Sequence, residues 1–255
     1  MKDITIIVPV VNMENEKNKE LFIRAIESID DSPIIVVGPE NDIKAIETLK
    51  LSKIMRVLVN KSQDTSYAFQ VNYAVKDVKT TYFSVLEFDD IYTSIWFKNV
   101  QQYLDTDTED TFAFLPLTEV IDVNMGPVGF ANEAVWASSF SEEIGCYDLQ
   151  CLEDYLDFNT SGGIFKTQDF ITLGSLKASM KLSFWYEFLL RATYKGKRIF
   201  VIPKIGYNHF IGREDSLSYI YGNNMSEAEA NWWINLAKKE YFFPHDRNKT
   251  YQAEE

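Results

Sequence analysis

Cysteine, proline and glycine are scarce in this chain, and no long apolar run interrupts it. The 255 residues include 2 cysteines, 7 prolines and 11 glycines. Cys146 and Cys151 are too few for a disulfide framework or a four-ligand zinc site, so we expect reduced thiols. The apolar run at residues 4–11 is far too short to cross a bilayer and carries no signal-peptide cleavage pattern. We therefore expect a soluble, cytoplasmic protein without a membrane span.

Positive charge is also in short supply. The chain has 25 Lys and Arg residues against 38 Asp and Glu residues, a formal net charge of −13 at pH 7. Without a basic run or stripe, duplex DNA is disfavoured as a partner, because DNA binding depends on neutralising phosphates. Internal repeats and phosphate-binding glycine motifs are missing as well. What is present is a chain that is 46% hydrophobic and 15% aromatic, enough to bury a large core.

The first third of the sequence alternates between two hydrophobic patterns. Short β-branched runs are typical of strands buried on both faces, and the segments between them have helical periodicity. The runs predict strands at residues 4–10, 34–37, 54–59 and 82–86, and helices at residues 19–29, 43–51 and from the capping residues 64–66 to Val75. This alternation predicts an α/β fold with a mixed, mostly parallel sheet flanked by helices.

The pattern changes after about residue 110. We expect strands at residues 112–117 and 133–138, joined through a turn at residues 125–127. A packed helix at residues 183–193 and a last core strand at residues 197–202 follow. Ser226 begins a capping box, which predicts a helix to about Tyr241, and the polar residues after Pro244, including His245, are expected to fray.

The fourth predicted strand ends in the acidic segment Glu87-Phe88-Asp89-Asp90. Ligands bind at this edge of open α/β sheets. Because alternate side chains of an extended segment point the same way, Glu87 and Asp89 can reach one ion. Carboxylates suit a hard cation such as Mn²⁺ or Mg²⁺. Taken alone, an acidic pair after a strand is more often a solvated turn or a helix cap than a metal site.

The order of these segments resembles the family 2 glycosyltransferases, which have a GT-A-type fold. The resemblance covers roughly residues 3–218 and is carried by the strand ending at Pro9, residues 25–29, 34–37, Asn72, the block at 82–90 that looks like an Asp-x-Asp-Asp motif, and residues 161–166, 186–192 and 197–203. It implies an inverting, metal-dependent transfer of a sugar from a nucleotide-diphosphate donor to a carbohydrate or other hydroxyl acceptor. It also implies a single domain over residues 1–255, with a nucleotide-binding half (1–110), an acceptor half (111–220) and a C-terminal helix and tail (221–255).

The resemblance suggests three metal ligands and a phosphate-binding residue. Asp89 stands at the second acidic position of the family motif, and Glu87 replaces the first Asp. His209 and Arg213 lie where related enzymes place groups near the metal and diphosphate. A neutral imidazole would complete the metal site, and Arg213 would neutralise phosphate charge. The alternative for His209 is an ordinary hydrogen-bonded loop histidine.

Nucleotide-binding candidates follow the first two strands. Pro9, Val10 and Asn12 end the first strand, and Asn72 belongs to the matching segment of the third helix. The family's usual acidic residue directly after the second strand is missing here. Glu40 and Asp42, which follow shortly after, are therefore the candidates for hydrogen bonds with the ribose of the donor. A plain helix N-terminus is the alternative for these two acids.

The catalytic base is the main departure from the family. An aromatic pair, Phe184-Trp185, stands where the family usually has the acidic pair that deprotonates the acceptor, and aromatic rings cannot take a proton. Glu187 lies two residues further on, about 200° around the helix. Glu153 and Asp154 are possible surrogates, although they precede the glycine segment. The aromatic pair favours one alternative, a binding or structural module that has lost activity. A second alternative, a transferase acting on modified DNA bases, is compatible with the fold but fits poorly with the net negative charge.

Overall fold

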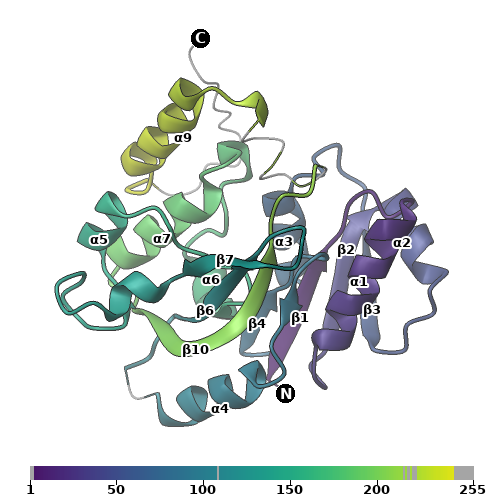
Figure 1. Ribbon diagram of the computed structural model, residues 1–255, viewed down its shortest axis with the longest axis horizontal. Helices are drawn as coiled ribbons and strands as arrows, with labels where there is room; N and C mark the ends of the chain where they lie inside the picture. The colour runs from purple at the N-terminus through teal and green to yellow at the C-terminus, as the bar shows by residue number, and fades with distance from the viewer. Residues whose placement is uncertain (1–2, 108, 215, 217–218, 220–222, 244–255) are drawn as a thin grey trace.

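The structure is a computed structural model that describes residues 3–107, 109–214, 216, 219 and 223–243. Within these residues a ten-stranded sheet lies at the centre, and helices cover both of its faces (Figure 1). The strand order is β3-β2-β1-β4-β9-β6-β10-β5, with β7 paired to β6 and β8 paired to β10. Strands from both halves of the sequence therefore share one sheet.

Six strands run in one direction. They are β1 (Ile4–Pro9), β2 (Ile34–Pro39), β3 (Ile54–Asn60), β4 (Tyr82–Val85), β6 (Ala113–Ile121) and β10 (Ile199–Phe210). The strands that run against them are β5 (Ile91–Tyr92), β7 (Pro127–Ala131), β8 (Cys146–Tyr147) and β9 (Ile164–Lys166). Because β9 is antiparallel to both β4 and β6, those two strands point the same way. The carboxyl ends of β1, β4, β6 and β10 consequently meet along one edge of the sheet.

Eight α-helices are described, and side chains cap the starts of some of them. They are α1 (Glu16–Ser28), α2 (Glu40–Glu47), α3 (Tyr67–Val75), α4 (Trp96–Thr106), α5 (Leu149–Asp154), α6 (Thr167–Thr172), α7 (Phe184–Tyr194) and α9 (Glu227–Glu240), with 3₁₀ turns at Glu133–Trp136 and Ala178–Met180. The side chains of Asn15, Ser66 and Ser226 accept backbone hydrogen bonds at the starts of α1, α3 and α9. Among the described residues, none of the helices has the length and apolarity needed to cross a bilayer.

Alternation along the central strands divides the core into two layers. On β1, Ile6 and Val8 belong to the cluster that includes residues of α1, α2 and α4, whereas Ile7 belongs to the cluster with residues of α3, α6 and α7. All three side chains are completely buried. A strand buried on both faces must be apolar throughout, which explains the uninterrupted β-branched run in the sequence.

The predicted fold class is confirmed by this mixed, mostly parallel sheet with helices on both faces. The strand predicted at residues 133–138 is wrong. Asn132 has a φ of 71°, which turns the chain into the 3₁₀ helix Glu133–Trp136. The strand that follows the predicted turn is β7 instead, and it pairs with the second half of β6.

The last core strand is longer than expected. We predicted an end at residue 202, but β10 continues to Phe210 through two register irregularities between Ile202 and Tyr207. Pro203 lies within this irregular stretch, where a missing backbone donor is tolerated. The extension carries His209 to the carboxyl edge of the sheet. The predicted frayed tail, with His245, lies outside the described residues.

Candidate functional site

The acidic segment leaves β4 at the carboxyl edge of the sheet, beside the end of β1. The Leu86 N–H donates to the carbonyl of Ile7 at 2.9 Å, which extends the β1–β4 pairing by one residue. The chain then turns, because the N–H of Asp90 donates to the carbonyl of Glu87 at 3.0 Å. In an extended segment alternate side chains point the same way, which would bring Glu87 and Asp89 together. Because the chain turns, the side chains of Glu87 and Asp90 converge instead.

Glu87 is positioned by the glycine segment and by β10. Its carboxylate accepts a hydrogen bond from the Ser161 hydroxyl at 2.5 Å, and its N–H donates to the Tyr207 hydroxyl at 3.1 Å. Gly162 brings this segment close, because its N–H donates to the carbonyl of Val85 at 3.0 Å. A Cβ on Gly162 would lie 2.3 Å from the Tyr207 ring, and its φ is +73°. Only glycine fits both requirements.

Asp90 is completely buried and connects the acidic turn to β10. Its Oδ1 accepts from the Phe210 N–H at 2.8 Å, and its Oδ2 lies 2.8 Å from Nδ1 of His209. The antiparallel pairing of β5 with β10, with Ile91 opposite Asn208, holds these groups in register. The extension of β10 is thus what brings His209 to the acidic turn.

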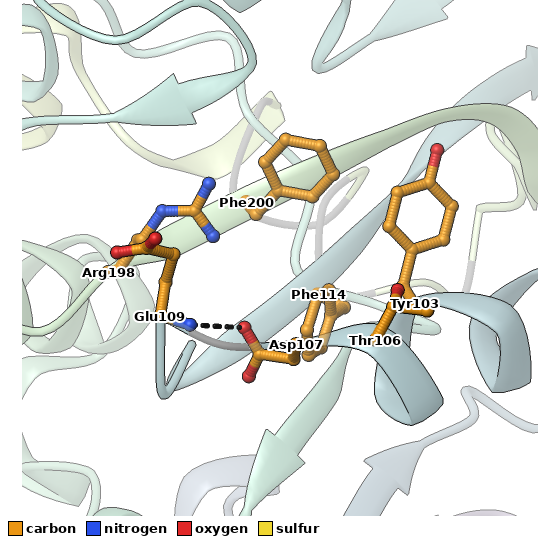
Figure 2. A pocket seen from close by; sticks show the side chains of 7 residues that line it. All are labelled: Tyr103, Thr106, Asp107, Glu109, Phe114, Arg198 and Phe200. Carbon is orange, nitrogen blue, oxygen red and sulfur yellow. Dashed lines mark hydrogen bonds between the residues drawn. The ribbon is translucent and has the colours of Figure 1, made fainter.

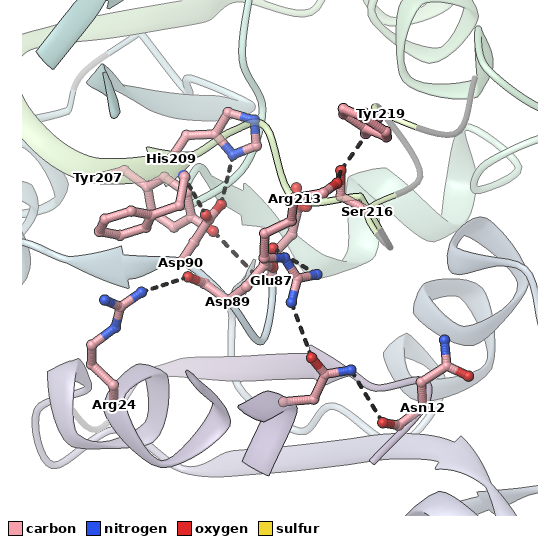
Figure 3. A network of polar contacts seen from close by, with 12 residues as sticks. Asn12, Arg24, Glu87, Asp89, Asp90, Tyr207, His209, Arg213, Ser216 and Tyr219 are labelled. Atoms are coloured by element: carbon pink, nitrogen blue, oxygen red, sulfur yellow. Dashed lines mark hydrogen bonds and ion pairs between the residues drawn. The ribbon is translucent and has the colours of Figure 1, made fainter. Parts of the chain in front are cut away.

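One ligand atom from each of Glu87, Asp90 and His209 lies within 4.8 Å of the other two. We call these three residues the acid–histidine cluster; Figure 3 shows it with its surroundings. Asp90 was not among the residues that we predicted as ligands, although it directly follows Asp89 in the sequence. The cluster combines two carboxylates with an imidazole, a ligand set that suits a divalent ion such as Mn²⁺.

Asp89 faces a different partner. Its carboxylate forms an ion pair with Arg213 at 3.1 Å, and its backbone carbonyl accepts from the Arg24 guanidinium at 3.0 Å. Arg213 also donates to the side chain of Asn18 at 3.2 Å and stacks 5.1 Å from the centre of the Phe88 ring. The structure thus places Arg213 beside the acidic turn, close to Asp89 and Glu87 (Figure 3).

Burial and mutual repulsion perturb every acid in this region. Burial raises the pKa of Glu87, and the charge of Asp90 raises it further. Burial, followed by the charge of Glu87, raises the pKa of Asp89 to about 6 against the opposing effect of Arg213. Burial also raises the pKa of Asp90, while His209 opposes the shift. Burial lowers the pKa of His209, but its carboxylate neighbours, Asp90 foremost, outweigh this and raise it to about 10. Three carboxylates held this close, two of them buried and Glu87 half-buried, favour an additional cation.

Comparisons with known proteins place this geometry in a familiar fold. No protein-family model and no curated protein matches the sequence. Among solved structures, Staphylococcus aureus TarS residues 1–349 in complex with UDP-GlcNAc superposes with a TM-score of 0.66 at 16% identity, over 94% of this chain and 66% of that one. The Pyrobaculum calidifontis mannosyltransferase PcManGT in complex with GDP-Man and Mn²⁺ gives a TM-score of 0.66 at 12% identity, over 93% and 64%.

The chain has a GT-A-type glycosyltransferase fold. It spans 66% of the length of that TarS chain and 64% of the length of the mannosyltransferase. The TM-scores of 0.66 establish the shared fold, whereas identities of 16% and 12% leave activity to be argued from the residues of the site. The fold predicted from the order of motifs is therefore confirmed.

A chain of hydrogen bonds connects the loop after β1 to Arg213. Asn18 donates to the carbonyl of Asn12 at 3.1 Å and accepts from Arg213 at 3.2 Å. Asp42 accepts from the N–H of Met13 at 2.6 Å, so this acid anchors the loop after β1. Asn18 was missed in the sequence because a polar residue near a helix start has no distinctive pattern.

The other predicted nucleotide-binding residues are spread more widely. Pro9 and Val10 are buried at the end of β1, and the Val10 N–H donates to the carbonyl of Val37 at 2.9 Å. Glu40 is exposed and pairs with Lys44 at 2.6 Å. Asn72 makes two hydrogen bonds with the backbone of Leu176, at 2.7 and 2.9 Å, and so ties α3 to the segment before α7.

None of the three base candidates has a hydrogen bond or ion pair with the acid–histidine cluster among the contacts of the described residues. Glu187 is completely buried between Lys177, at 3.0 Å, and Arg191, at 2.8 Å. Glu153 accepts a hydrogen bond from Tyr241 of the C-terminal region at 3.3 Å. Asp154 is exposed and accepts from Gln150 at 2.9 Å. Glu187 is therefore an interior ion-pair partner, for the physical reason that both of its oxygens are bound by buried cations.

A separate open pocket of 160 Å³ lies at the opposite edge of the sheet, near the first residues of β6 and β10 (Figure 2). Its lining residues are Tyr103, Thr106, Asp107, Glu109, Phe114, Arg198 and Phe200. The cation among them, Arg198, is already bound by Glu143 at 2.6 Å. Ligands of open α/β sheets bind at the carboxyl edge, so we place the candidate site at the acid–histidine cluster.

Proposed function

We propose that this chain is a metal-dependent glycosyltransferase that moves a sugar from a nucleotide-diphosphate donor to a hydroxyl acceptor with inversion at the anomeric carbon. The observation that carries the proposal is the acid–histidine cluster, whose ligand atoms lie within 4.8 Å of one another at the carboxyl edge of a GT-A-type fold. Arg213 stands next to it and is paired with Asp89 at 3.1 Å. A cation site beside an arginine is the arrangement that a diphosphate leaving group requires.

Glu87, Asp90 and His209 fit a divalent cation in spacing, and they fit it in chemistry when the cation displaces the proton that Asp90 stabilises on His209. Carboxylates suit Mn²⁺ and Mg²⁺, and an imidazole nitrogen favours Mn²⁺ over Mg²⁺ within this pair. The raised pKa values of Glu87 and Asp90 point the same way, because burial makes their charges costly without a counter-ion. When bound, the cation supplies positive charge that stabilises the departing diphosphate.

The chain's own residues would hold the donor in place around this charge. Arg213 presents guanidinium donors to phosphate oxygens, and Asn18 fixes the orientation of that guanidinium. Asn12, with a φ of 56°, shapes the loop after β1 toward the same region. Ser161 and Tyr207 hold Glu87 from two other elements. Donors fixed in advance lose little energy to reorganisation during transfer.

Calorimetry with nucleoside diphosphates in the presence and absence of Mn²⁺ tests the proposal. UDP and GDP each serve as probe with wild type, Asp90→Asn and the surface control Asp105→Asn. Asp105 is exposed and contacts only the side chain of Gln101 among the hydrogen bonds of the described residues. We expect metal-dependent binding that Asp90→Asn abolishes and Asp105→Asn retains. Wild-type protein that binds neither diphosphate with Mn²⁺ would refute the proposal.

The acceptor base is left open by this proposal, since Glu187 is held by buried cations and Glu153 and Asp154 point to other contacts. The stereochemical course can be measured without knowing the base. Hydrolysis of an α-linked nucleotide sugar followed immediately by proton NMR shows which anomer of the sugar forms first. The inverting mechanism requires the β-anomer, and initial release of the α-anomer contradicts it.

A second candidate is a binding module that keeps the fold without turnover. The observation that favours it is the absence of a free acid at the start of α7, where Phe184 and Trp185 stand and Glu187 is completely buried. Such a module would bind a nucleotide sugar with metal but release no free sugar from it. Wild-type binding combined with the absence of donor hydrolysis over many hours would select this candidate.

A further inference from the structure

One buried indole connects α4 with two elements of the candidate site. Trp96 is the first residue of α4, and its side chain is completely buried in the core layer that also contains Tyr92 and Tyr207. Its Nε1–H donates to the carbonyl of Gly162 at 3.1 Å, although the two residues are 66 positions apart in the sequence. The start of α4 therefore makes a buried polar contact with the glycine segment, residues 161–163.

The same indole packs against the backbone of β10. A Cβ built on Gly206 would lie 2.2 Å from Cε3 of Trp96, so any residue other than glycine would displace the ring. The carbonyl of Gly206 also accepts a hydrogen bond at 3.0 Å from the N–H of Thr93, three residues before Trp96. The start of α4 is thus fixed to β10 by a hydrogen bond and by close contact.

Each of these contacts lies one residue away from a group that holds Glu87. Gly162 follows Ser161, whose hydroxyl donates to the Glu87 carboxylate at 2.5 Å. Gly206 precedes Tyr207, whose hydroxyl accepts from the Glu87 N–H at 3.1 Å. One indole therefore supports both residues that hold Glu87 from other elements.

A second buried tryptophan has a different kind of contact. Trp233 of α9 is also completely buried, but its Nε1–H donates at 3.4 Å to the side chain of Glu229, one turn earlier in the same helix. That hydrogen bond stays within one element, whereas the hydrogen bond of Trp96 joins α4 to the segment beside Glu87. Burial of an indole by itself therefore does not account for the contacts of Trp96.

We infer that Trp96 is a positioning residue for the candidate cation site, and that its indole holds the glycine segment and β10 at the separation that directs Glu87 toward the rest of the acid–histidine cluster. The inference rests on the proposed function, because this cluster is the site that would hold the cation. Hydrogen bonds behind the ligands of a metal orient those ligands, and their loss typically lowers metal affinity by roughly 10- to 100-fold. Trp96 acts through Ser161 and Tyr207, one step further from the ion, so we expect an effect at the lower end of this range.

The test compares Trp96→Phe with the matched control Trp233→Phe. Each substitution removes one buried indole and its hydrogen bond while keeping an aromatic ring. Calorimetry with Mn²⁺ alone should show binding about tenfold weaker for Trp96→Phe and unchanged for Trp233→Phe. Both variants should lose thermal stability, because each substitution leaves unfilled volume in the core. The melting temperature by itself therefore does not distinguish a positioning role from a structural one.

The electron paramagnetic resonance spectrum of bound Mn²⁺ gives a readout that a loss of stability alone would not change. Its line shape depends on the arrangement of the ligand atoms around the ion. At saturating Mn²⁺, we expect the spectrum of Trp96→Phe to differ from that of wild type and the spectrum of Trp233→Phe to match it.

If Trp96→Phe does not fold, nuclear magnetic resonance on wild-type protein replaces it. The probe is Zn²⁺, a diamagnetic ion that carboxylates and imidazole also bind. The indole N–H signals of Trp96 and Trp233 are followed in ¹H–¹⁵N spectra up to the saturation that calorimetry defines. We expect Zn²⁺ to shift the signal of Trp96, because the orientation of Glu87 is coupled to it through the glycine segment, and to leave that of Trp233 unchanged.

Weaker Mn²⁺ binding with an altered spectrum, confined to Trp96→Phe, supports the inference. Wild-type affinity and spectrum in Trp96→Phe, or equal losses in the two variants, overturn it, as does an unmoved Trp96 signal in the measurement on wild-type protein. Wild-type protein that binds Mn²⁺ but no nucleoside diphosphate refutes the proposed function and leaves this comparison valid. Wild-type protein that binds no Mn²⁺ overturns both.

Discussion

Replacing Glu187 with glutamine separates a structural role from a catalytic one at the position that sequence reasoning offered as a base. The Glu187 carboxylate is completely buried and accepts from Arg191 Nε at 2.9 Å and Nη2 at 2.8 Å. Lys177 Nζ lies 3.0 Å from Oε1 of Glu187 and also donates to the carbonyl of Glu240 at 2.7 Å. Arg191 donates further to the carbonyls of Leu173 and Ser175. The acid thus neutralises two cations that fasten α9 and residues 173–177 to α7.

Glutamine keeps the volume of Glu187 but removes its charge, which leaves Lys177 and Arg191 buried without their anion. Breaking a buried ion pair from one side costs about 3–5 kcal/mol. A domain of this size loses about 2–4 °C of melting temperature per kcal/mol, so we expect a decrease of about 10 °C. Glu40→Gln is the matched control, because its ion pair with Lys44 is on the surface and its loss should change the melting temperature little.

The loss should also depend on pH with a defined sign. Burial lowers the pKa of Lys177 from 10.5, and Glu187 opposes this shift. Without Glu187, the folded state binds the Lys177 proton less tightly while the unfolded state still takes it up below pH 10.5. Stability rises with pH wherever the unfolded state binds more protons. The deficit of Glu187→Gln relative to wild type should therefore shrink between pH 7 and pH 9 in thermal unfolding. A variant that melts with wild type yet hydrolyses no donor would refute this structural assignment.

Three further changes test the site and its supports. Asp90→Asn should lower Mn²⁺ affinity about 100-fold or more in calorimetry, with a smaller effect for Asp89→Asn, because Asp89 is paired with Arg213; equal effects would contradict the cluster. Gly162→Ala should cost about 2 kcal/mol more in chemical denaturation than Gly196→Ala, because both glycines have positive φ but only Gly162 lies against a ring; equal costs would mean that the Tyr207 contact is unimportant. Asn132→Ala should lower the free energy of unfolding by about 3 kcal/mol in the same assay, because the buried amide of Asn132 makes hydrogen bonds with Pro116, Tyr147 and Asn159. A decrease below about 1 kcal/mol would show that water replaces these hydrogen bonds.

Hydrophobic periodicity predicted the first part of the fold correctly, because the strands and helices there are defined by which residues are buried. The strands β1 to β4 and the helices between them follow from runs of apolar residues whose spacing allows one structure only. The strand prediction for residues 133–138 was wrong because their apolar content is typical of a strand. In the structure, the positive φ of Asn132 turns the chain into a 3₁₀ helix instead. That conformation depends on the four hydrogen bonds of the Asn132 side chain to other elements, which are invisible in a local pattern.

The same distinction applies to the site. Glu87, His209 and Arg213 were identified from motif order, which records where strands end, and the structure brings them close together. Asp90, rather than Asp89, lies with Glu87 and His209 in the cluster because the chain turns here. The turn is closed by one backbone hydrogen bond, from the Asp90 N–H to the Glu87 carbonyl at 3.0 Å. A rule that assumes an extended chain cannot detect a turn within four residues.

The turn has a consequence for how charge is distributed over the site. If the segment were extended, Glu87 and Asp89 would share one ion and Asp90 would point away. Because it turns, Asp90 meets His209, and Asp89 is left to pair with Arg213 at 3.1 Å. The acidic segment therefore contributes Asp90 to a candidate cation site and Asp89 to the ion pair with Arg213, and these are the two positive charges that the proposed diphosphate donor needs. A single four-residue segment can in this way position both, since its two aspartates leave the turn in different directions.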